Sequence, residues 1–117
     1  MTFNPVPKPS HKRFKQTRGQ RTRITQKARQ AVYERSNGKC ERCGRTRAYA
    51  FEVAHLISAA MGGSGSDPAN LVLLCGPSVN SGTCHHWADS TAEGREWRKK
   101  KRKELIIIYE RKNRTQD

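Results

Sequence analysis

The chain has 117 residues, of which 33% are hydrophobic, so it is long enough for one small domain with a limited apolar core. Its formal net charge is +14, and most of the excess lies at the two ends: residues 1–39 hold eleven Lys and Arg against one acid, and residues 95–117 hold ten against four. With no apolar run that approaches the length of a membrane span, this composition argues against a membrane protein. It favours a polyanionic partner, nucleic acid first, over two solvated tails that only aid solubility.

The beginning of the chain, residues 1–21, is rich in Pro, Lys, Arg and Gln, and we expect it to form a basic, flexible arm. This segment lacks the apolar centre of a signal peptide. We therefore expect a cytoplasmic protein in a reducing compartment.

A helix is predicted after the arm, in the sequence ITQKARQAVYERS. Ala28, Ala31 and Val32 share one face at helical spacing. Thr22 or Thr25 can cap the start of this helix, and the turn-forming SNG follows its end.

The centre of the chain alternates apolar stretches with loops. The β-formers in RAYAFEVAHLI predict a strand, and the glycines of MGGSGSDPAN predict a loop. NLVLLC fits a short strand or the start of a helix, and GPSVNSGT is a second loop. No internal repeat is visible.

Two helices are predicted near the end of the chain. CHHWADS opens a short helix, and a basic helix covers about residues 91–104. LIIIY, at residues 105–109, continues this helix or forms a strand: its β-branched run favours a strand and its neighbours favour a helix.

Four cysteines indicate a metal site. Cys40 and Cys43 form a CxxC followed by Gly44, a pattern typical of a zinc knuckle, and Cys75 and Cys84 complete a set of four with none left over. In a reducing compartment such a set favours metal over disulfides. We predict a closed, structural zinc site; a thioredoxin-like redox use is disfavoured because no βαβ pattern surrounds the CxxC.

The histidines of the centre, His55, His85 and His86, each fit a bland interpretation when taken singly, as core or surface residues bonded to backbone. Together with their neighbours they form an ordered set: CxxCG, VAH, GG, NLVLLC and CHHWAD. In this order the sequence resembles the HNH endonucleases, the ββα-metal nucleases, over about residues 24–94. The matching residues are Cys40, Cys43, His55, Gly62, Gly63, Asn70, Leu71, Leu74, Cys75, Cys84 and His85.

The resemblance implies an α+β fold: a small ββα-metal (HNH, His-Me finger) domain with a four-cysteine zinc site and flanking basic helices or arms. We place the arm at residues 1–21, the nuclease domain at 22–94 and a basic helix or tail at 95–117. By resemblance, His55 is the general base and Asn70 holds the loop that orients it. His85 and Asp89 would hold the catalytic ion, Mg²⁺ or Mn²⁺ with other divalent ions as alternatives, and i, i+4 spacing puts both on one helix face.

The sequence departs from the family pattern in two places. The residue before the base is usually a metal ligand, and here it is Ala54, which cannot bind an ion. Glu52 lies on the same face of the strand as Ala54 and could reach the catalytic ion directly or through water. The loop between Cys75 and Cys84 is long, which makes His86 a fallback ligand to His85.

The predicted function is metal-dependent cleavage of DNA, one strand at a time and with low intrinsic sequence specificity. The alternative is a non-catalytic zinc-knuckle module that binds DNA or RNA, in which Ala54 marks a decayed site. Small stand-alone proteins that resemble this one often come from phages, so phage packaging or recombination proteins are candidate partners. We expect the protein to lie in the cytoplasm, that of the host if a phage encodes it, and to be a monomer or weak dimer. The residues predicted to contact nucleic acid are Arg21, Arg23, Arg98, Lys99, Lys100, Lys101, Arg102 and Lys103.

Overall fold

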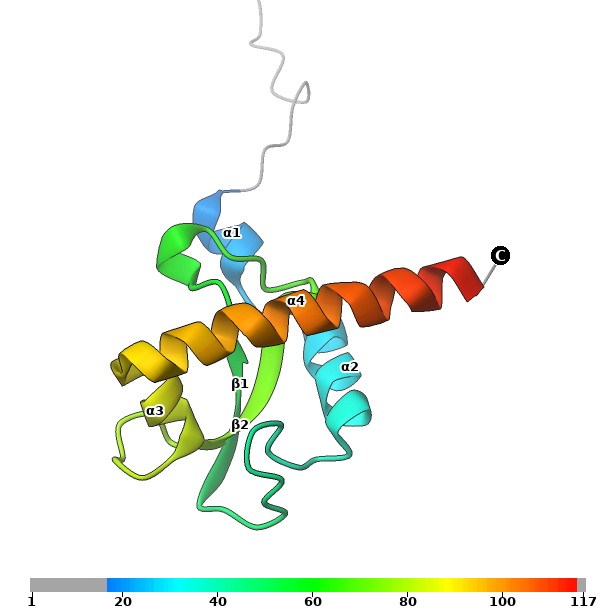
Figure 1. Ribbon diagram of the computed structural model, residues 1–117. Coiled ribbons are helices and arrows are strands. Elements are labelled where there is room, and N and C mark those ends of the chain that lie inside the picture. Colours follow the sequence, from blue (N-terminus) through cyan, green and yellow to red (C-terminus); the bar gives the residue numbers. More distant parts are fainter. Residues whose placement is uncertain (1–16, 116–117) are drawn as a thin grey trace, which may run out of the picture.

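The computed structural model describes residues 17–115, and a two-stranded antiparallel sheet lies at the centre of this part of the chain (Figure 1). Strand β1 (Ala50–His55) pairs with strand β2 (Leu71–Gly76), with Ala50 opposite Gly76 and His55 opposite Leu71. The apolar part of NLVLLC, residues 71–75, is therefore strand rather than helix. The sheet and its surrounding helices confirm the predicted α+β class. Residues 1–16 of the predicted arm, which we placed at residues 1–21, lie outside the described residues.

Helix α2 (Gln26–Ser36) covers one face of the sheet, close to the predicted position. The Thr25 hydroxyl accepts the N–H of Ala28 at 3.1 Å, which caps the helix, and the left-handed Asn37 (φ 56°) ends it. The side chains of a strand alternate between its two faces, and every residue of β2 is buried, so both faces of β2 are covered. The core on the α2 face consists of Ala28, Val32, Val53, Leu71 and Leu73.

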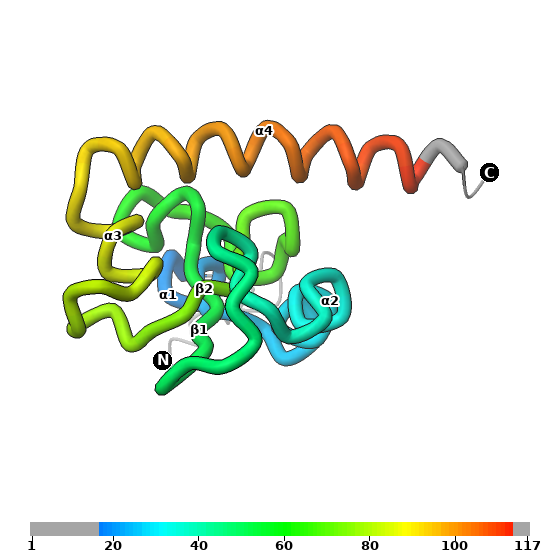
Figure 2. Tube along the Cα trace, turned by 60° about the horizontal axis from the view of Figure 1, so that its bottom comes forward, coloured from blue at the N-terminus to red at the C-terminus, as the bar shows by residue number. Residues whose placement is uncertain are grey.

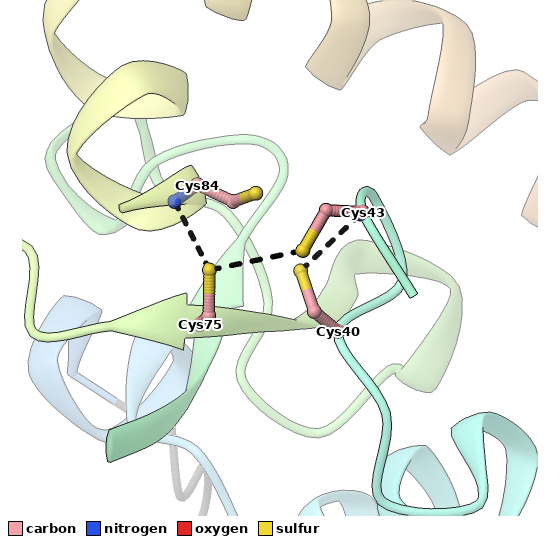
Figure 3. Close-up of side chains that lie close together, drawn as sticks. All are labelled: Cys40, Cys43, Cys75 and Cys84. Atoms are coloured by element: carbon pink, nitrogen blue, oxygen red, sulfur yellow. Dashed lines mark hydrogen bonds between the residues drawn. The ribbon is translucent and has the colours of Figure 1, made fainter. Parts of the chain in front are cut away.

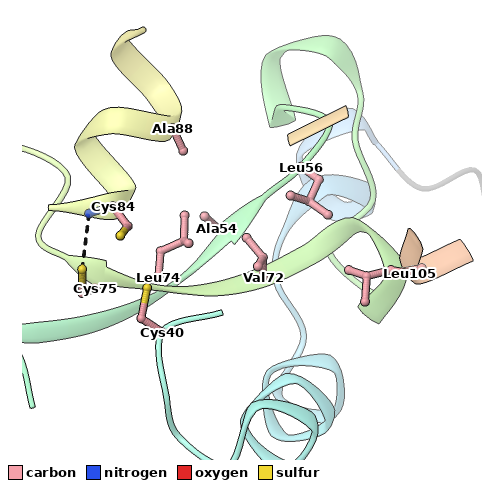
Figure 4. Close-up of a cluster of buried hydrophobic side chains, with 10 residues drawn as sticks. Cys40, Ala54, Leu56, Val72, Leu74, Cys75, Cys84, Ala88 and Leu105 are labelled. Carbon is pink, nitrogen blue, oxygen red and sulfur yellow. Dashed lines mark hydrogen bonds between the residues drawn. The ribbon is translucent and has the colours of Figure 1, made fainter. Parts of the chain in front are cut away.

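Helices α3 (Cys84–Ser90) and α4 (Ala92–Thr115) cover the other face of the sheet (Figure 4). They cross closely at Gly94, where an added Cβ would lie 2.1 Å from the carbonyl oxygen of Trp87. The core on this face consists of Cys40, Ala54, Leu56, Ala69, Val72, Leu74, Cys75, Cys84, Ala88 and Leu105.

Helix α4 is one continuous helix that crosses the domain and extends past it at its C-terminal end (Figures 1 and 2). The LIIIY stretch is helical, because helical geometry carries Leu105 into the core, where it is 1% exposed. Tertiary packing here overrides the β-branched preference for a strand. None of the helices between residues 17 and 115 combines the length and apolar content that crossing a membrane requires.

A short helix, α1 (Arg18–Thr22), precedes α2 and was not predicted. Thr17 and Gln20 form a capping box at its start: each side chain accepts a hydrogen bond from the other's backbone N–H. The predicted boundary between arm and domain, after residue 21, falls inside this helix. The loop predicted between the strands contains two 3₁₀ turns, η1 (Ala59–Met61) and η2 (Pro68–Asn70).

Arg35, near the end of α2, joins several segments through its guanidinium group. It forms a bidentate pair with Glu41, at 2.6 and 3.0 Å, and donates to the carbonyl oxygens of Pro68 and Leu71. Its Nη1 also lies 3.3 Å from the Tyr109 hydroxyl of α4. Burial alone lowers the pKa of Arg35, but the Glu41 carboxylate outweighs it and raises the pKa above its ordinary value. Through these separate contacts Arg35 links α2 to β2 and to α4.

Candidate active site and metal centre

The four cysteines converge from three parts of the fold (Figure 3). Cys40 and Cys43 lie in the turn after α2, Cys75 is near the end of β2, and Cys84 is the first residue of α3. All four are free, and their sulfur atoms lie within 4.8 Å of one another. Four sulfurs at about 2.3 Å from a tetrahedral zinc ion would be about 3.8 Å apart. The Cys43–Cys75 separation of 4.0 Å matches that value, so the set fits the ion.

The cysteine thiols differ in acidity. Burial raises the pKa of Cys40, but hydrogen bonds from backbone N–H groups of Cys43, Cys75 and Arg42 outweigh it and lower that pKa to about 7. Burial, with neighbouring thiols, raises the pKa of Cys84 to about 12 against the opposing effect of Arg42. A divalent ion bound by all four sulfurs must therefore displace protons from some of them.

Arg42 connects the zinc knuckle to α3. Its guanidinium lies 3.6 Å above the ring of Trp87, and its Nη1 is 3.4 Å from the sulfur of Cys84. Trp87 in turn meets Trp97 of α4 edge to face, with ring centroids 6.1 Å apart. These contacts hold the start of α3 between the knuckle and α4.

A cavity of about 200 Å³ opens between the end of β1 and helices α3 and α4. It brings together His55, His85 and Asp89, three of the residues to which the sequence assigned catalytic or ion-binding roles. The lining residues are Val53, Ala54, His55, Ser58, Ala59, His85, Asp89 and Arg98.

His55, at the end of β1, is held through one ring nitrogen. Its Nε2 lies 2.7 Å from the backbone carbonyl oxygen of Thr22, at the end of α1. A carbonyl oxygen can only accept, so Nε2 carries the proton in this contact. In the neutral ring Nδ1 is then left with a lone pair, as a general base requires. Sequence reasoning missed the Thr22 carbonyl, because a backbone acceptor 33 residues away leaves no pattern.

Asn70 fixes the loop that follows His55. Its side chain is 1% exposed: Oδ1 accepts the N–H of Ile57, and Nδ2 donates to the carbonyl oxygens of Ile57 and Ser64. Gly63 is required for this approach, since an added Cβ would lie 1.8 Å from the Ile57 oxygen and 2.9 Å from Asn70 Nδ2. These three hydrogen bonds connect Asn70 to the loop at Ile57 and Ser64, and none of them involves the ring of His55.

His85 and Asp89 lie one turn apart on α3. His85 Nε2 is 3.3 Å from Asp89 Oδ2, and on its other side Nδ1 is 2.8 Å from Glu52 Oε1. Glu52 therefore reaches the site by bonding the back of the His85 ring, and it also accepts the N–H of Ser78 at 3.0 Å. Gly76 leaves room for this carboxylate, since a Cβ there would lie 2.3 Å from it.

Arg98 of α4 is the one member of the predicted nucleic-acid-binding set that lines the cavity. Its side chain is 15% exposed, and Nη1 lies 3.8 Å from Asp89 Oδ1. Its Nε is buried without a hydrogen-bond partner among the residues that the structure describes. The sequence placed Arg98 in a basic run but gave no indication that it alone turns inward to the cavity.

Other predicted residues lie elsewhere. His86, the fallback ligand, contacts the Ser78 carbonyl oxygen through Nδ1 at 2.9 Å and does not line the cavity. Lys101 and Arg102 are half-buried and lie 3.9 Å from Glu104 and Asp67. The exposed members of the basic set are Arg21, Arg23, Lys99, Lys100 and Lys103.

Residues 40–77 match the family model described as HNH endonuclease. This match is consistent with an HNH family member. The match begins at Cys40, contains His55 and Asn70, and ends just after Cys75, so α3 with His85 and Asp89 follows the matched segment. No curated protein and no solved structure matches the chain.

The described part of the chain thus combines two sites of different character. The cysteine site would be closed, since four protein sulfurs could complete a tetrahedral shell around an ion. The cavity is open and is lined by the imidazole of His55, the His85–Asp89 pair and Arg98. In the described residues the cysteines are the only group of three or more His, Cys, Asp or Glu placed to share an ion. An ion at His85 and Asp89 would have positions left for water and substrate.

Proposed function

We propose that this protein is a metal-dependent endonuclease that hydrolyses phosphodiester bonds in DNA, one strand at a time. The observation that carries the proposal is a single cavity lined by His55 and by the His85–Asp89 pair. A base and a cation site on the same cavity can act on one phosphate from two sides. The HNH match supports the same class of function.

His55 supplies the base in this proposal. Its Nε2–H is held by the Thr22 carbonyl, so Nδ1 takes a proton from water as the water oxygen attacks phosphorus. The bond from phosphorus to the 3′ oxygen then breaks, and that oxygen takes a proton from solvent. General-base help of this kind contributes about 10²–10⁴-fold to the rate.

His85 and Asp89 fit a divalent ion. One imidazole nitrogen and one carboxylate suit Mg²⁺ or Mn²⁺, which keep waters and take substrate phosphate oxygens in their remaining positions. When bound, such an ion stabilises negative charge on the phosphate in the transition state and on the departing oxygen. Glu52 contacts the Nδ1 side of the His85 ring and orients it, rather than binding the ion. Because Ala54 has no ligand atom, the ion would have two protein ligands, His85 and Asp89, rather than three.

Exposed cations would hold the DNA. Lys99, Lys100 and Lys103 lie on the outer side of α4, and Arg98 turns into the cavity from the same helix. A smaller recess of about 160 Å³ adjoins the cavity, since Ser58 and Arg98 line both. Phosphate contacts position a duplex without reading its sequence, so we propose low intrinsic specificity.

A non-catalytic nucleic-acid-binding module is the second candidate. Ala54 supports it, because the family's usual ligand is missing at that position. The closed cysteine site and the basic surface are sufficient for such a module. It does not need the His55 contact with Thr22 or the support of His85 by Glu52.

Incubation with supercoiled plasmid, with and without Mg²⁺ or Mn²⁺, separates the two candidates. We expect wild type to nick the plasmid only when the metal is present. The nicking rate of His55→Ala should be at least about 10²-fold lower. The control His86→Ala should nick at the wild-type rate, because His86 lies outside the cavity. Intact plasmid under all metals, together with binding in gel shifts, would favour the module. RNA in place of plasmid tests whether RNA is the preferred substrate.

The compartment and the partners are also proposals. Four free cysteines grouped for an ion support a reducing cytoplasm, that of the host if a phage encodes the protein. We propose a structural zinc ion, a monomer or weak dimer, and action beside phage packaging or recombination proteins.

A further inference from the structure

We propose that the segment from Thr17 to Thr25 is a positioning element for His55: it sets the tautomer of the imidazole and aims Nδ1 into the cavity. The proposal rests on the proposed function in treating His55 as the base. Its starting point is that the hydrogen bond that holds this ring comes from outside the segment matched to the HNH family, through the Thr22 carbonyl oxygen.

The segment is built to present that carbonyl. The capping box of Thr17 and Gln20 starts α1, and the Thr22 hydroxyl bonds back to the carbonyl oxygen of Arg18 at 2.9 Å. Thr22 is 8% exposed, so its backbone is buried against the domain. The direction of the carbonyl is therefore fixed by α1.

Gly65 docks this segment onto the loop that follows His55. Its N–H donates to the Arg21 carbonyl oxygen at 3.0 Å, and its own carbonyl accepts the N–H of Thr25 at 2.9 Å. An added Cβ at Gly65 would lie 2.0 Å from the Arg23 carbonyl oxygen and 2.4 Å from that of Thr22. Both atoms are backbone, so they can move away only if the whole segment shifts. Only glycine at position 65 allows the two backbone segments to approach this closely. A substitution of Gly65 should therefore displace the Thr22 carbonyl from His55.

The consequence is a link between substrate binding and the base. Arg21 and Arg23 are exposed on either side of Thr22, so phosphates that bind them lie one residue from the carbonyl that orients His55. Contacts to DNA at these arginines would hold the segment in its docked position. The base is then best aligned when substrate is present.

The test measures the tautomer of the His55 imidazole by ¹⁵N NMR of the full-length, zinc-loaded protein with labelled histidine. The pH is kept above the ordinary titration range of histidine, so that the ring is neutral. Comparison with His55→Ala assigns the His55 signals. We expect the Nε2–H tautomer in wild type and a shift toward Nδ1–H in Gly65→Ala. With metal, Gly65→Ala should nick plasmid about 10–10²-fold more slowly, since the base is misaligned.

The control is Gly19→Ala, because the nearest atom to an added Cβ at Gly19 is Thr17 Oγ1 at 4.0 Å. It should keep the wild-type tautomer and nicking rate. A folded Gly65→Ala with both wild-type properties would overturn the proposal, as would an Nδ1–H tautomer in wild type. If Gly65→Ala does not fold, the wild-type tautomer alone decides.

The tautomer also separates this proposal from the proposed function. A protein that never nicks DNA, yet changes its His55 tautomer in Gly65→Ala, would refute the nuclease and leave the positioning role in place.

Discussion

At the scale of single residues, the chemistry of the cavity depends on what lies behind each histidine. Thr22 accepts from Nε2 of His55, and Glu52 contacts Nδ1 of His85. In the proposed mechanism each partner leaves the opposite nitrogen of its ring available: Nδ1 of His55 would take a proton, and Nε2 of His85 would bind an ion beside Asp89. Two imidazoles thereby acquire different capacities from their partners rather than from their own chemistry.

Glu52 can be tested by substitution because its contact is made by a side chain, whereas the Thr22 contact is made by the backbone. Glu52→Gln keeps the size and an accepting oxygen but removes the charge that favours the Nδ1–H form of His85. We expect the affinity for Mn²⁺, measured by titration, to fall about 10-fold and nicking to slow by 10–10²-fold, as for other outer partners of metal ligands. Glu34→Gln, on the exposed side of α2, is the matched control. Wild-type Mn²⁺ affinity in Glu52→Gln would show that Glu52 does not orient the ligand.

The residues of the cavity were predictable to different degrees. The ordered motifs singled out His55, His85 and Asp89, and strand alternation put Glu52 near them. The Thr22 carbonyl and the inward turn of Arg98 could not be predicted, because each depends on how a distant helix docks. A backbone oxygen carries no residue type, and a basic run looks the same whichever member faces the protein.

At the scale of elements, α3 is shared by both sites. Cys84 is its first residue and belongs to the zinc set, His85 follows directly, and Asp89 lies one turn on. The stacking of Arg42 on Trp87 fastens the same helix to the knuckle. Loss of an ion bound by the four cysteines would therefore reach the cavity through α3 without touching His55.

Zinc removal tests this link. We expect Cys40→Ser to lose zinc and to melt at a markedly lower temperature, because binding of the ion is coupled to folding. In wild type, zinc affinity should fall as the pH falls, and more steeply below about pH 7: there Cys40, with its pKa lowered to about 7, adds one more proton for zinc to displace. Circular dichroism and zinc analysis measure both. A normal melting curve in Cys40→Ser would contradict the coupling.

The elements themselves followed from the sequence except where packing decided. The pattern gave α2, β1 and α3, and the undecided choices were settled by burial: β2 is enclosed on both faces, and Leu105 enters the core from α4. Helix α1 was missed because it is five residues long and polar, with Thr22 alone buried.

At the scale of the whole molecule, the charge is distributed unevenly along the chain. The four cysteines and most residues of the cavity come from the less basic centre of the sequence, while Lys99, Lys100 and Lys103 form an exposed row on α4. Lys101 and Arg102 are half-buried and lie 3.9 Å from Glu104 and Asp67. Lys99 also lies 3.2 Å from an acid, Glu96, but both side chains of that pair are exposed. The exposed row is therefore the part of the predicted basic helix that phosphates can reach from solvent.

Neutralising this row should weaken DNA binding in a salt-dependent way. The triple change of Lys99, Lys100 and Lys103 to Gln should reduce the slope of log affinity against log salt by up to about 3, since each phosphate contact contributes about 0.9. Changing the same three residues to Arg keeps the charge and should keep the slope. Fluorescence anisotropy at several salt concentrations measures both. An unchanged slope in the Gln variant would place the DNA on another face.

The central claim is that His55 and the His85–Asp89 pair do separate jobs in one cavity, and Mn²⁺ titration of zinc-loaded variants tests it most directly. Asp89→Asn should bind Mn²⁺ at least about 10-fold more weakly than wild type. His55→Ala should bind Mn²⁺ as wild type does, yet nick plasmid at least about 10²-fold more slowly. Wild-type Mn²⁺ binding by Asp89→Asn, or wild-type nicking by His55→Ala, would contradict the claim.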